Sequence, residues 1–332
     1  MHDARKAPVI IEKSDKPAII RLKIGDEAAG QRLDNFLVKQ LKGVPKSRIY
    51  RMLREGELRV NGRRAKPDQR LAMDDEVRIP PVRTAAPDAN PALAKIGKSL
   101  LGRIIYQDEA ILIIDKPAGQ AVHGGSGVSL GIIEQLRREM PECRFMELAH
   151  RLDKETSGIL ILALKRSALV ELHRMLREGE VRKTYLALAV GHWRDKLRHV
   201  KLALRKFHTD DGERRVTVDE EGQFAHTIFS LIDQYGNAAG NPGFSLLEAE
   251  LKTGRTHQIR VHLAALKHPI AGDDKYGIFE LNRNLKKQGL KRMFLHAARI
   301  DFFHPLTGQR LELATPLPPD LQGFLDSMRN QP

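Results

Sequence analysis

Apolar residues at helical spacing predict two short helices near the start of the chain. The first helix would bury one face between Leu33 and Leu41 and end at the break Gly43-Val-Pro45. The second would begin at about Lys46, where apolar residues again recur every third or fourth position. Each helix therefore has one apolar side to bury and one polar side to leave in solvent.

Strand patterns follow these helices and complete a small first domain. We expect the strands at 58–62, which leads into a turn, and at 71–80. Residues 1–19 show no periodicity, so a flexible leader is expected ahead of a domain that spans 20–83. The alanine- and proline-rich stretch that comes next predicts a linker over 84–100.

Strand patterns outnumber helical ones in the rest of the chain, which we expect to form a second domain at 101–320. A hairpin is predicted within 103–115, and further strands are expected at 159–164, 184–190, 215–218, 224–231, 244–251 and 293–303. Helices are predicted at 129–139, 167–178 and 257–266. This pattern predicts an α+β fold with a mixed, largely antiparallel sheet flanked by helices.

The charge of the chain narrows the choice of partners. Its 332 residues include 56 Lys and Arg against 42 Asp and Glu, a net charge of +14. Such an excess is typical of proteins that bind phosphate backbones, whereas a membrane-surface protein usually concentrates it in one amphipathic helix or tail. No apolar run approaches the length of a membrane span, so we expect no membrane partner. The single Cys143 excludes an intramolecular disulfide and a cysteine metal site, which favours the cytoplasm.

Basic residues concentrate in the predicted first domain. Between Arg32 and Lys66 there are 11 basic residues against three acids, a net charge of +8. The candidates for RNA contacts are Lys46, Arg48, Arg51, Arg54, Arg63 and Arg64. The three arginines of the second helix recur every third residue and would project from one side. A solvated helix pair is the alternative, but a stripe of cations favours RNA binding.

This region resembles the S-four type of RNA-binding domain, which is named after a small-subunit ribosomal protein. The resemblance rests on Arg32-Leu-Asp-Asn-Phe-Leu, then Lys46-Ser-Arg, then Gly56-Glu-Leu-Arg-Val-Asn-Gly62. It implies that a small S-four-like domain contributes affinity and site choice for RNA.

In the second domain, a carboxylate among cations stands directly before a predicted buried strand. The segment His150-Arg-Leu-Asp-Lys-Glu-Thr-Ser-Gly158 surrounds Asp153 with a histidine, an arginine and a lysine, and it leads into an apolar run that ends at Leu164. A carboxylate at the mouth of such a strand is held on a rigid scaffold, as a catalytic group must be. An aspartate paired with a neighbouring arginine in a structural network is the alternative, and taken alone it is the more common case.

Three further segments carry residues suited to chemistry. The glycine-rich stretch 116–127 follows a strand and would form one wall of a nucleotide pocket, although a flexible turn has the same composition. Tyr185 lies in a short strand and could stack on a base or pack in the core. The segment 251–263 leads into a helix that carries Arg255 and Arg260, whose guanidinium groups suit a phosphate or a carboxylate.

Metal binding at this last segment is disfavoured. His257 and His262 are five residues apart, one more than in a His-x-x-x-His pair, and no Glu lies between them. An ordinary helix start accounts for the same residues.

Together these four segments resemble one enzyme family, the RluA-type pseudouridine synthases. That family carries Lys-Pro-x-Gly-x-x-Val-His, His-Arg-Leu-Asp-x-x-Thr-Ser-Gly, Lys-x-Tyr-x-Ala and Thr-Gly-Arg-x-His-Gln-Ile-Arg-x-His, and all four occur here in that order. The resemblance covers 103–316 and, with the S-four-like domain, nearly the whole chain. The stretches 41–46 and 121–127 are most similar to the branch of the family that acts on large-subunit ribosomal RNA.

The resemblance implies roles for residues inside the motifs. The positions that match catalytic residues of the family are Asp153, Tyr185 and Arg260. The positions expected to bind substrate are Arg151, Ile259, His123, Arg255 and His257. Of these, Arg151 matches the arginine that helps to displace the target base from its stack, and Tyr185 matches the tyrosine that lies against the flipped uracil.

The implied reaction converts uridine to pseudouridine in 23S ribosomal RNA or a large-subunit precursor. A nitrogen–carbon glycosidic bond breaks, the uracil rotates, and it rejoins through carbon, so no redox change and no group donor is involved. We therefore expect no metal and no cofactor. We also expect a monomeric protein. Asp153 would act either as a nucleophile or as a base toward the ribose, and Arg260 would keep its carboxylate ionised in a partly dry pocket.

Two other functions fit parts of the sequence. A non-catalytic RNA-binding ribosome-assembly factor would use the first domain but has no need of Asp153 beside an arginine and a tyrosine. A metal-dependent nuclease would use the histidines as ligands, yet the sequence has no acidic metal cluster. The full set of motifs favours the enzyme.

Overall fold

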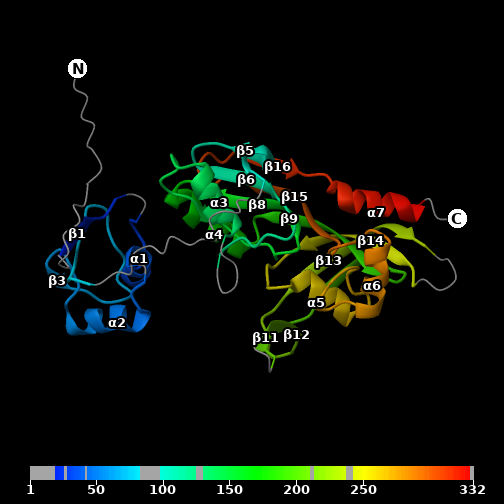
Figure 1. Ribbon diagram of the computed structural model, residues 1–332, viewed down its shortest axis with the longest axis horizontal. Coiled ribbons are helices and arrows are strands. Elements are labelled where there is room, and N and C mark those ends of the chain that lie inside the picture. The colour runs from blue at the N-terminus through cyan, green and yellow to red at the C-terminus, as the bar shows by residue number, and fades with distance from the viewer. Residues whose placement is uncertain are drawn as a thin grey trace, which may run out of the picture. The chain divides into compact units, whose positions relative to one another are not determined.

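The computed structural model describes residues 19–25, 28–41, 43–82, 98–124, 130–209, 213–236 and 242–329. The predicted leader, apart from residue 19, and the predicted linker up to residue 97 lie outside this described part. The chain divides into two compact units between Ala94 and Lys95 (Figure 1). None of the helices within the described ranges is long and apolar enough to cross a membrane.

The first unit packs two helices against a small antiparallel sheet. Its elements are β1 (Ile20–Lys23), α1 (Leu33–Gln40), α2 (Lys46–Glu55), β2 (Arg59–Val60), β3 (Arg63–Arg64) and β4 (Glu76–Ile79), and the strand order is β1-β4-β2-β3. Both helices lie where the apolar spacing predicts them, and residues such as Leu33, Ile49 and Val77 form the buried core.

A two-residue turn joins β2 to β3. Asn61 and Gly62 both adopt positive φ, +51° and +74°, and Val60 pairs directly with Arg63. Two consecutive positive φ angles match the twist of a hairpin, and Asn-Gly is the pair that adopts them most readily. This local chemistry explains why the turn could be predicted from the sequence.

The second unit is built on one large sheet. Its strands are β5 (Ile104–Gln107), β6 (Ile111–Lys116), β7 (Glu147–Leu148), β8 (Ser157–Ala163), β9 (Arg182–Val190), β10 (Leu197–Lys201), β11 (Leu204–His208), β12 (Arg214–Val218), β13 (His226–Tyr235), β14 (Phe244–Leu251), β15 (Leu295–Phe303) and β16 (Arg310–Ala314). Its helices are a short 3₁₀ turn (Leu101–Arg103), α3 (Ile132–Glu139), α4 (Arg166–Glu178), α5 (Gln258–Ala265), α6 (Phe279–Lys287) and α7 (Pro319–Arg329).

The strand order shows a mixed, largely antiparallel sheet, as the sequence predicts. The order is β10-β13-β14-β9-β15-β8-β6-β5, with β16 on β15 and β7 on β8, while β11 and β12 form a separate hairpin. The strands pair antiparallel except β15 and β8, which run parallel.

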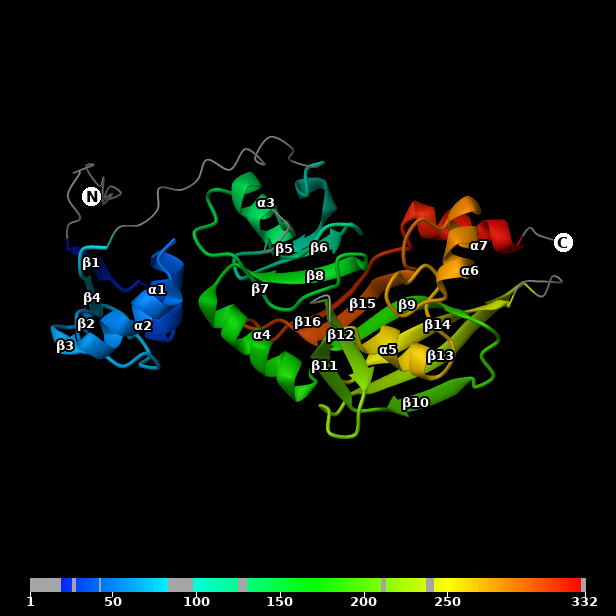
Figure 2. The same ribbon diagram turned by 60° about the horizontal axis from the view of Figure 1, so that its bottom comes forward.

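Helices cover both faces of the sheet because the strands at its β5–β6–β8 end are apolar on both sides. Along β6, Ile111 and Ile113 pack with α4, while Leu112 and Ile114 face the opposite way into the core that contains α3. This alternation follows the two-residue period of a strand. Figure 2 shows α3 and α4 on opposite sides of β8. The buried seven-residue strand β8 thus anchors the chain directly after the segment that carries Asp153.

A glycine permits the parallel contact between β8 and β15. Gly158 has φ +108°, and a Cβ added there would lie 2.2 Å from the carbonyl oxygen of Ala297. Only a glycine fits so close to a neighbouring backbone. Ser157 and Gly158 therefore begin β8 at a point where two strands approach closely, and Gly158 stands five residues after Asp153.

We expect Gly158→Ala to lower the free energy of unfolding by about 1–3 kcal/mol, because the new methyl group overpacks the β8–β15 contact at a positive φ. Urea unfolding would measure the change. Gly323→Ala is the matched control, since a Cβ at Gly323 meets open space in α7; the control should raise stability by up to about 1 kcal/mol. Equal urea midpoints for Gly158→Ala and the parent chain would contradict the close approach.

Candidate active site

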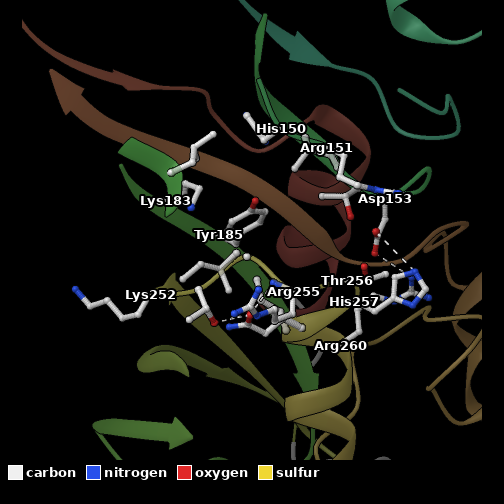
Figure 3. Close-up of a pocket in the computed structure, with 18 of the residues that line it drawn as sticks. His150, Arg151, Asp153, Lys183, Tyr185, Lys252, Arg255, Thr256, His257 and Arg260 are labelled. Carbon is white, nitrogen blue, oxygen red and sulfur yellow. Dashed lines mark hydrogen bonds and ion pairs between the residues drawn. The ribbon is translucent and has the colours of Figure 1, made fainter. Parts of the chain in front are cut away.

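A cavity of about 750 Å³ lies in the second unit, within the range of about 300–1,000 Å³ that is typical of small-molecule sites. Its walls come from the segment 149–153 ahead of β8, from α4, from β9 and from the turn 251–257 that leads from β14 into α5. In Figure 3, Asp153 and Lys183 lie on opposite sides of Tyr185. The cavity therefore extends in two directions from the tyrosine.

Asp153 is held at one side of the cavity by Arg260. Nη1 of Arg260 donates a hydrogen bond to Oδ2 of Asp153 at 3.1 Å. The aspartate side chain is 18% exposed, whereas the arginine side chain is only 5% exposed. The arginine thus lies behind the carboxylate and leaves part of it open to a ligand.

A second aspartate fixes the arginine. Nε and Nη2 of Arg260 donate to the two carboxylate oxygens of Asp273, both at 2.7 Å, and Nη2 also lies 3.3 Å from Asp274. Burial alone would raise the pKa of Asp273, but Arg260 and the backbone N–H groups of Lys275 and Tyr276 outweigh it and hold the pKa below its usual range. For Arg260, burial lowers the pKa and the carboxylates of Asp273 and Asp153 more than restore it. Both groups are therefore ionised at neutral pH.

His257 approaches the other carboxylate oxygen of Asp153. Its Nε2 lies 3.8 Å from Oδ1, and its Nδ1 is hydrogen-bonded to the hydroxyl of Tyr276 at 2.8 Å. The Tyr276 hydroxyl also accepts the backbone N–H of Val216 on β12 at 3.0 Å, and its ring lies 5.1 Å from the Arg260 guanidinium. Burial lowers the pKa of His257, although Asp153 opposes the shift. A neutral imidazole therefore faces the carboxylate.

The turn before α5 is shaped by Gln258. Its Oε1 accepts from the hydroxyl of Thr253 at 2.7 Å and from the N–H of Arg255 at 2.9 Å, while its Nε2 donates to the carbonyl of His226. His257, next to it, has φ +52°, a left-handed conformation that non-glycine residues rarely adopt. Such strain persists only where neighbouring contacts determine the backbone, and it concentrates at functional sites.

The glycine-rich stretch has a different place from the one predicted. Lys116 is fully buried, and its ammonium donates to the carbonyls of Pro117, Gln120 and Lys154 at 2.8, 2.9 and 3.1 Å. The described residues of this stretch, 116–124, do not line the cavity. Lys116 instead supports the Asp153 segment through the carbonyl of Lys154. The prediction of a pocket wall is therefore wrong for residues 116–124, and residues 125–127 lie outside the described part.

Tyr185 and Ile259 line the cavity from β9 and α5. No hydrogen bond joins the Tyr185 hydroxyl to another described residue, and the side chain is largely buried. Burial and, to a smaller extent, the charge of Asp153 raise the pKa of this tyrosine. Its hydroxyl thus keeps its proton and is free to meet a ligand.

Of the other predicted substrate contacts, two line the cavity and one does not. Arg151 lines the cavity and is exposed, with no ion pair or hydrogen bond from its side chain to a residue in the described ranges, so Asp153 is not its structural partner. Arg255 also lines the cavity and donates through Nε to the carbonyl of Phe224 at 3.1 Å. His123 is exposed after β6 and is not among the residues that line the cavity.

The basic residues of the first unit do not all point away from it. Lys46, Arg51, Arg54 and Arg63 are exposed, and no ion pair engages them within the described residues. Arg64 is turned back onto the carbonyl of Arg54. Arg48 is half-buried and paired with Glu57 at 3.2 Å, so the predicted stripe of three arginines on α2 is reduced to two.

The histidine pair of α5 has structural contacts. His262 is fully buried, with Nδ1 hydrogen-bonded to the hydroxyl of Thr227 at 2.9 Å and Nε2 to the carbonyl of Leu202 at 3.2 Å. No group of three or more His, Cys, Asp or Glu side chains in the described part of the chain could hold a metal ion.

Two functional residues were missed in the sequence. Asp273 and Tyr276 lie in the turn-rich segment between α5 and α6, where Asn282 of α6 donates to the Asp273 carbonyl at 2.8 Å and accepts the N–H of Gly272 at 2.9 Å. Their only sequence signal is the turn-forming composition of residues 268–277, since the contacts with Arg260 arise on folding. The completed group has a carboxylate paired with a guanidinium, a neutral imidazole and a phenol that retains its proton, which suits nucleophilic or acid–base chemistry on a polar ring.

Comparison with known protein families agrees with this chemistry. The family described as RNA pseudouridylate synthase matches residues 110–265, and the S4 domain matches residues 31–77 in the first unit.

Curated proteins resemble the chain along nearly its whole length. "Ribosomal large subunit pseudouridine synthase C" of Pasteurella multocida is 48% identical over 322 residues, which cover 96% of this chain and 97% of that protein. The protein of the same name from Escherichia coli K12 is 48% identical over 323 residues, covering 96% and 99%. Among solved structures, "Human RNA Pseudouridylate Synthase Domain Containing 1" is 26% identical with a TM-score of 0.56, and it covers 72% of this chain and 98% of its own.

We expect Tyr276→Phe to release the His257 ring while retaining the aromatic contact with Arg260. In the parent chain the Tyr276 hydroxyl accepts from Val216, so we expect its proton to point to Nδ1 of His257 and the imidazole proton to lie on Nε2, toward Asp153. The variant should lose this single tautomer and about 1–3 kcal/mol of stability, because the Val216 N–H loses its acceptor. Nitrogen-15 NMR of the histidines and urea unfolding would measure both effects.

Tyr106→Phe is the matched control, because it removes a hydroxyl hydrogen bond to Asp108 at 2.9 Å outside the cavity. It should leave the His257 resonances unchanged. A His257 tautomer that is the same in Tyr276→Phe and the parent chain would contradict the role of Tyr276.

Proposed function

The chain belongs to the ribosomal large subunit pseudouridine synthase C family of RNA pseudouridine synthases, and we propose that it isomerises particular uridines of 23S ribosomal RNA. The name of its curated relatives and their coverage of almost the whole chain support this substrate. The observation that carries the proposal is the partly open carboxylate of Asp153, held by the buried Arg260 beside Tyr185 in one cavity. The cytoplasm, where ribosomal RNA is made, is the corresponding location.

The carboxylate of Asp153 is the reactive group in this proposal. During the isomerisation the bond from C1′ to N1 breaks, the bond from C1′ to C5 forms, and the proton of C5 is replaced by one on N1. Asp153 either attacks C1′ as a nucleophile or removes a ribose proton, and either step requires the ionised form. The guanidinium of Arg260, 3.1 Å from Oδ2 of Asp153, pairs with this carboxylate in a partly dry site.

Tyr185 and Arg151 serve the base in different ways. Tyr185 offers a ring against which a uracil can stack and a hydroxyl that retains its proton, so it can assist the proton transfer. Arg151 stands exposed where the cavity opens and has no protein partner within the described residues, so it is free to occupy the place of an extruded base. Extrusion costs a few kcal/mol, which binding elsewhere has to offset.

The S4 domain is the proposed source of much of that binding. Its exposed cations would contact phosphates without reading the bases, and such contacts make affinity depend on salt. The chemistry itself would stay with the second unit, which carries the cavity. The expectation that neither metal nor cofactor takes part stays a prediction, and treatment with a chelator would test it.

We expect Asp153→Asn to lower the rate of pseudouridine formation by about 10³-fold or more, because an amide is neither a nucleophile nor a base here. Affinity for the RNA should change little. Single-turnover assays on 23S ribosomal RNA transcripts would measure the rate, and filter binding would measure the affinity. Asp326→Asn, on the exposed side of α7, is the control with unchanged rate. Full activity of Asp153→Asn would overturn the proposed role, and a deletion strain with an unaltered pseudouridine map of its 23S RNA would overturn the substrate.

We expect the double substitution of Arg51 and Arg54 by Gln to weaken RNA binding and to reduce the salt dependence. The slope of log affinity against log salt should fall by about 1.4, at ~0.7 for each phosphate contact on a single strand. The matched control replaces Arg21 and Lys23 by Gln, which removes the same charge from residues already paired with Glu76 and Asp74. A slope that changes equally in the two double variants would mean that α2 makes no specific phosphate contacts.

A further inference from the structure

The cavity continues past Tyr185 to a part that the reaction at Asp153 leaves unexplained. Lys183 lies two residues before Tyr185 on β9, so both side chains point to the same face, about 7 Å apart along the strand. Both line the cavity (Figure 3). On one side of Tyr185 the cavity holds the Asp153–Arg260 ion pair, whereas on the other side it holds the ammonium of Lys183.

Lys183 has no anionic partner among the described residues. Its neighbours on the adjacent strands, Leu251 of β14 and Ile300 of β15, are both apolar. Glu250 is engaged by Arg182 and Lys252 instead. No ion pair or hydrogen bond joins the Lys183 ammonium to any residue that the structure describes.

An unpaired ammonium in such a place opposes folding. Removing a charge from water without a partner is costly, and the cost is expressed as a shift toward the neutral form. Burial accordingly lowers the pKa of Lys183 to about 8. The presence of this destabilising cation in the cavity is explained if an anionic ligand pairs with it.

We propose that Lys183 binds a phosphodiester of the substrate RNA next to the target uridine. The inference rests on the proposed function, since an RNA that places uracil against Tyr185 also brings a phosphate within reach along β9. In this proposal the spacing of Tyr185 and Lys183 along β9 matches the distance from the uracil to a neighbouring phosphate. Lys183 is a substrate-binding residue in this proposal and takes no part in bond breaking.

Equilibrium binding of a short single-stranded oligouridylate tests the subsite directly. We expect Lys183→Met, which keeps the apolar stem, to weaken binding about tenfold, equivalent to about 1.4 kcal/mol. The salt slope should fall by about 0.7, the value for one phosphate contact on a single strand. Lys183→Arg should keep most of both. Lys286→Met, which removes an exposed lysine of α6, is the control for net charge alone.

The pH dependence gives a second readout. The phosphate is bound by the protonated amine, so affinity of the parent chain should be full below the pKa of about 8 and fall as the pH rises above it. His150 is the titratable group that interacts with Lys183, and the pKa of about 4 that burial gives it leaves it neutral across this range. The fall above pH 8 should be absent in Lys183→Met and in Lys183→Arg, whose guanidinium stays charged.

Stability separates binding from a structural role. Replacing an unpaired, partly buried cation by an apolar side chain should leave the melting temperature of Lys183→Met unchanged or raise it. A lowered melting temperature, or unaltered affinity and salt slope in Lys183→Met, would overturn the subsite. Failure of the proposed function would look different, because the parent chain would then form no pseudouridine in 23S RNA while the oligouridylate measurements still reported on Lys183.

Discussion

The arrangement of the site depends on one buried guanidinium that serves two carboxylates in different ways. Arg260 donates through Nε and Nη2 to Asp273, whose side chain is fully buried. It donates through Nη1 to Asp153, whose side chain is 18% exposed. Removing one partner of a buried ion pair costs about 3–5 kcal/mol, so the structural demand for a counter-charge is strong. Because Asp273 meets that demand, Asp153 needs only one hydrogen bond to the same arginine and can still face a substrate.

Segments far apart in the chain have to converge for this division to work. Two contacts hold the Asp153 segment. The Lys116 ammonium donates to the carbonyl of Lys154, and Gly158 allows the close contact between β8 and β15. Gln258 shapes the turn ahead of Arg260, and Asn282 holds the backbone of Asp273. These supports are mostly hydrogen bonds from side chains to the backbone, so they fix the positions of the reactive groups by holding the chain that carries them.

Local pattern explains how much of this could be predicted. The helices and strands with clear periodicity lie near their predicted positions, as β14 at 244–251 does, and the Asn61-Gly62 turn follows from backbone preference. The resemblance to a family singled out Asp153, Tyr185 and Arg260. Asp273 was missed because its contact with Arg260 across a turn exists only after folding. Lys183 lies inside the Lys-x-Tyr-x-Ala motif but was given no role, because its lack of a counter-ion also becomes visible only in the fold. Residues 116–124 were misplaced for the same reason, since composition does not tell whether an ammonium points into a cavity or behind it.

The excess positive charge of the chain has two physically different locations. Exposed cations such as Arg51 are well hydrated, and salt screens their field within about 8 Å at physiological ionic strength. Lys183 is poorly hydrated when the site is empty, so it gains more from a phosphate than a surface lysine does. A nucleotide that stays stacked in a helix keeps its phosphate outside the cavity and cannot realise that gain. Lys183 would therefore add binding free energy only for the extruded nucleotide. This free energy helps to offset the cost of extrusion at the place where the reaction occurs.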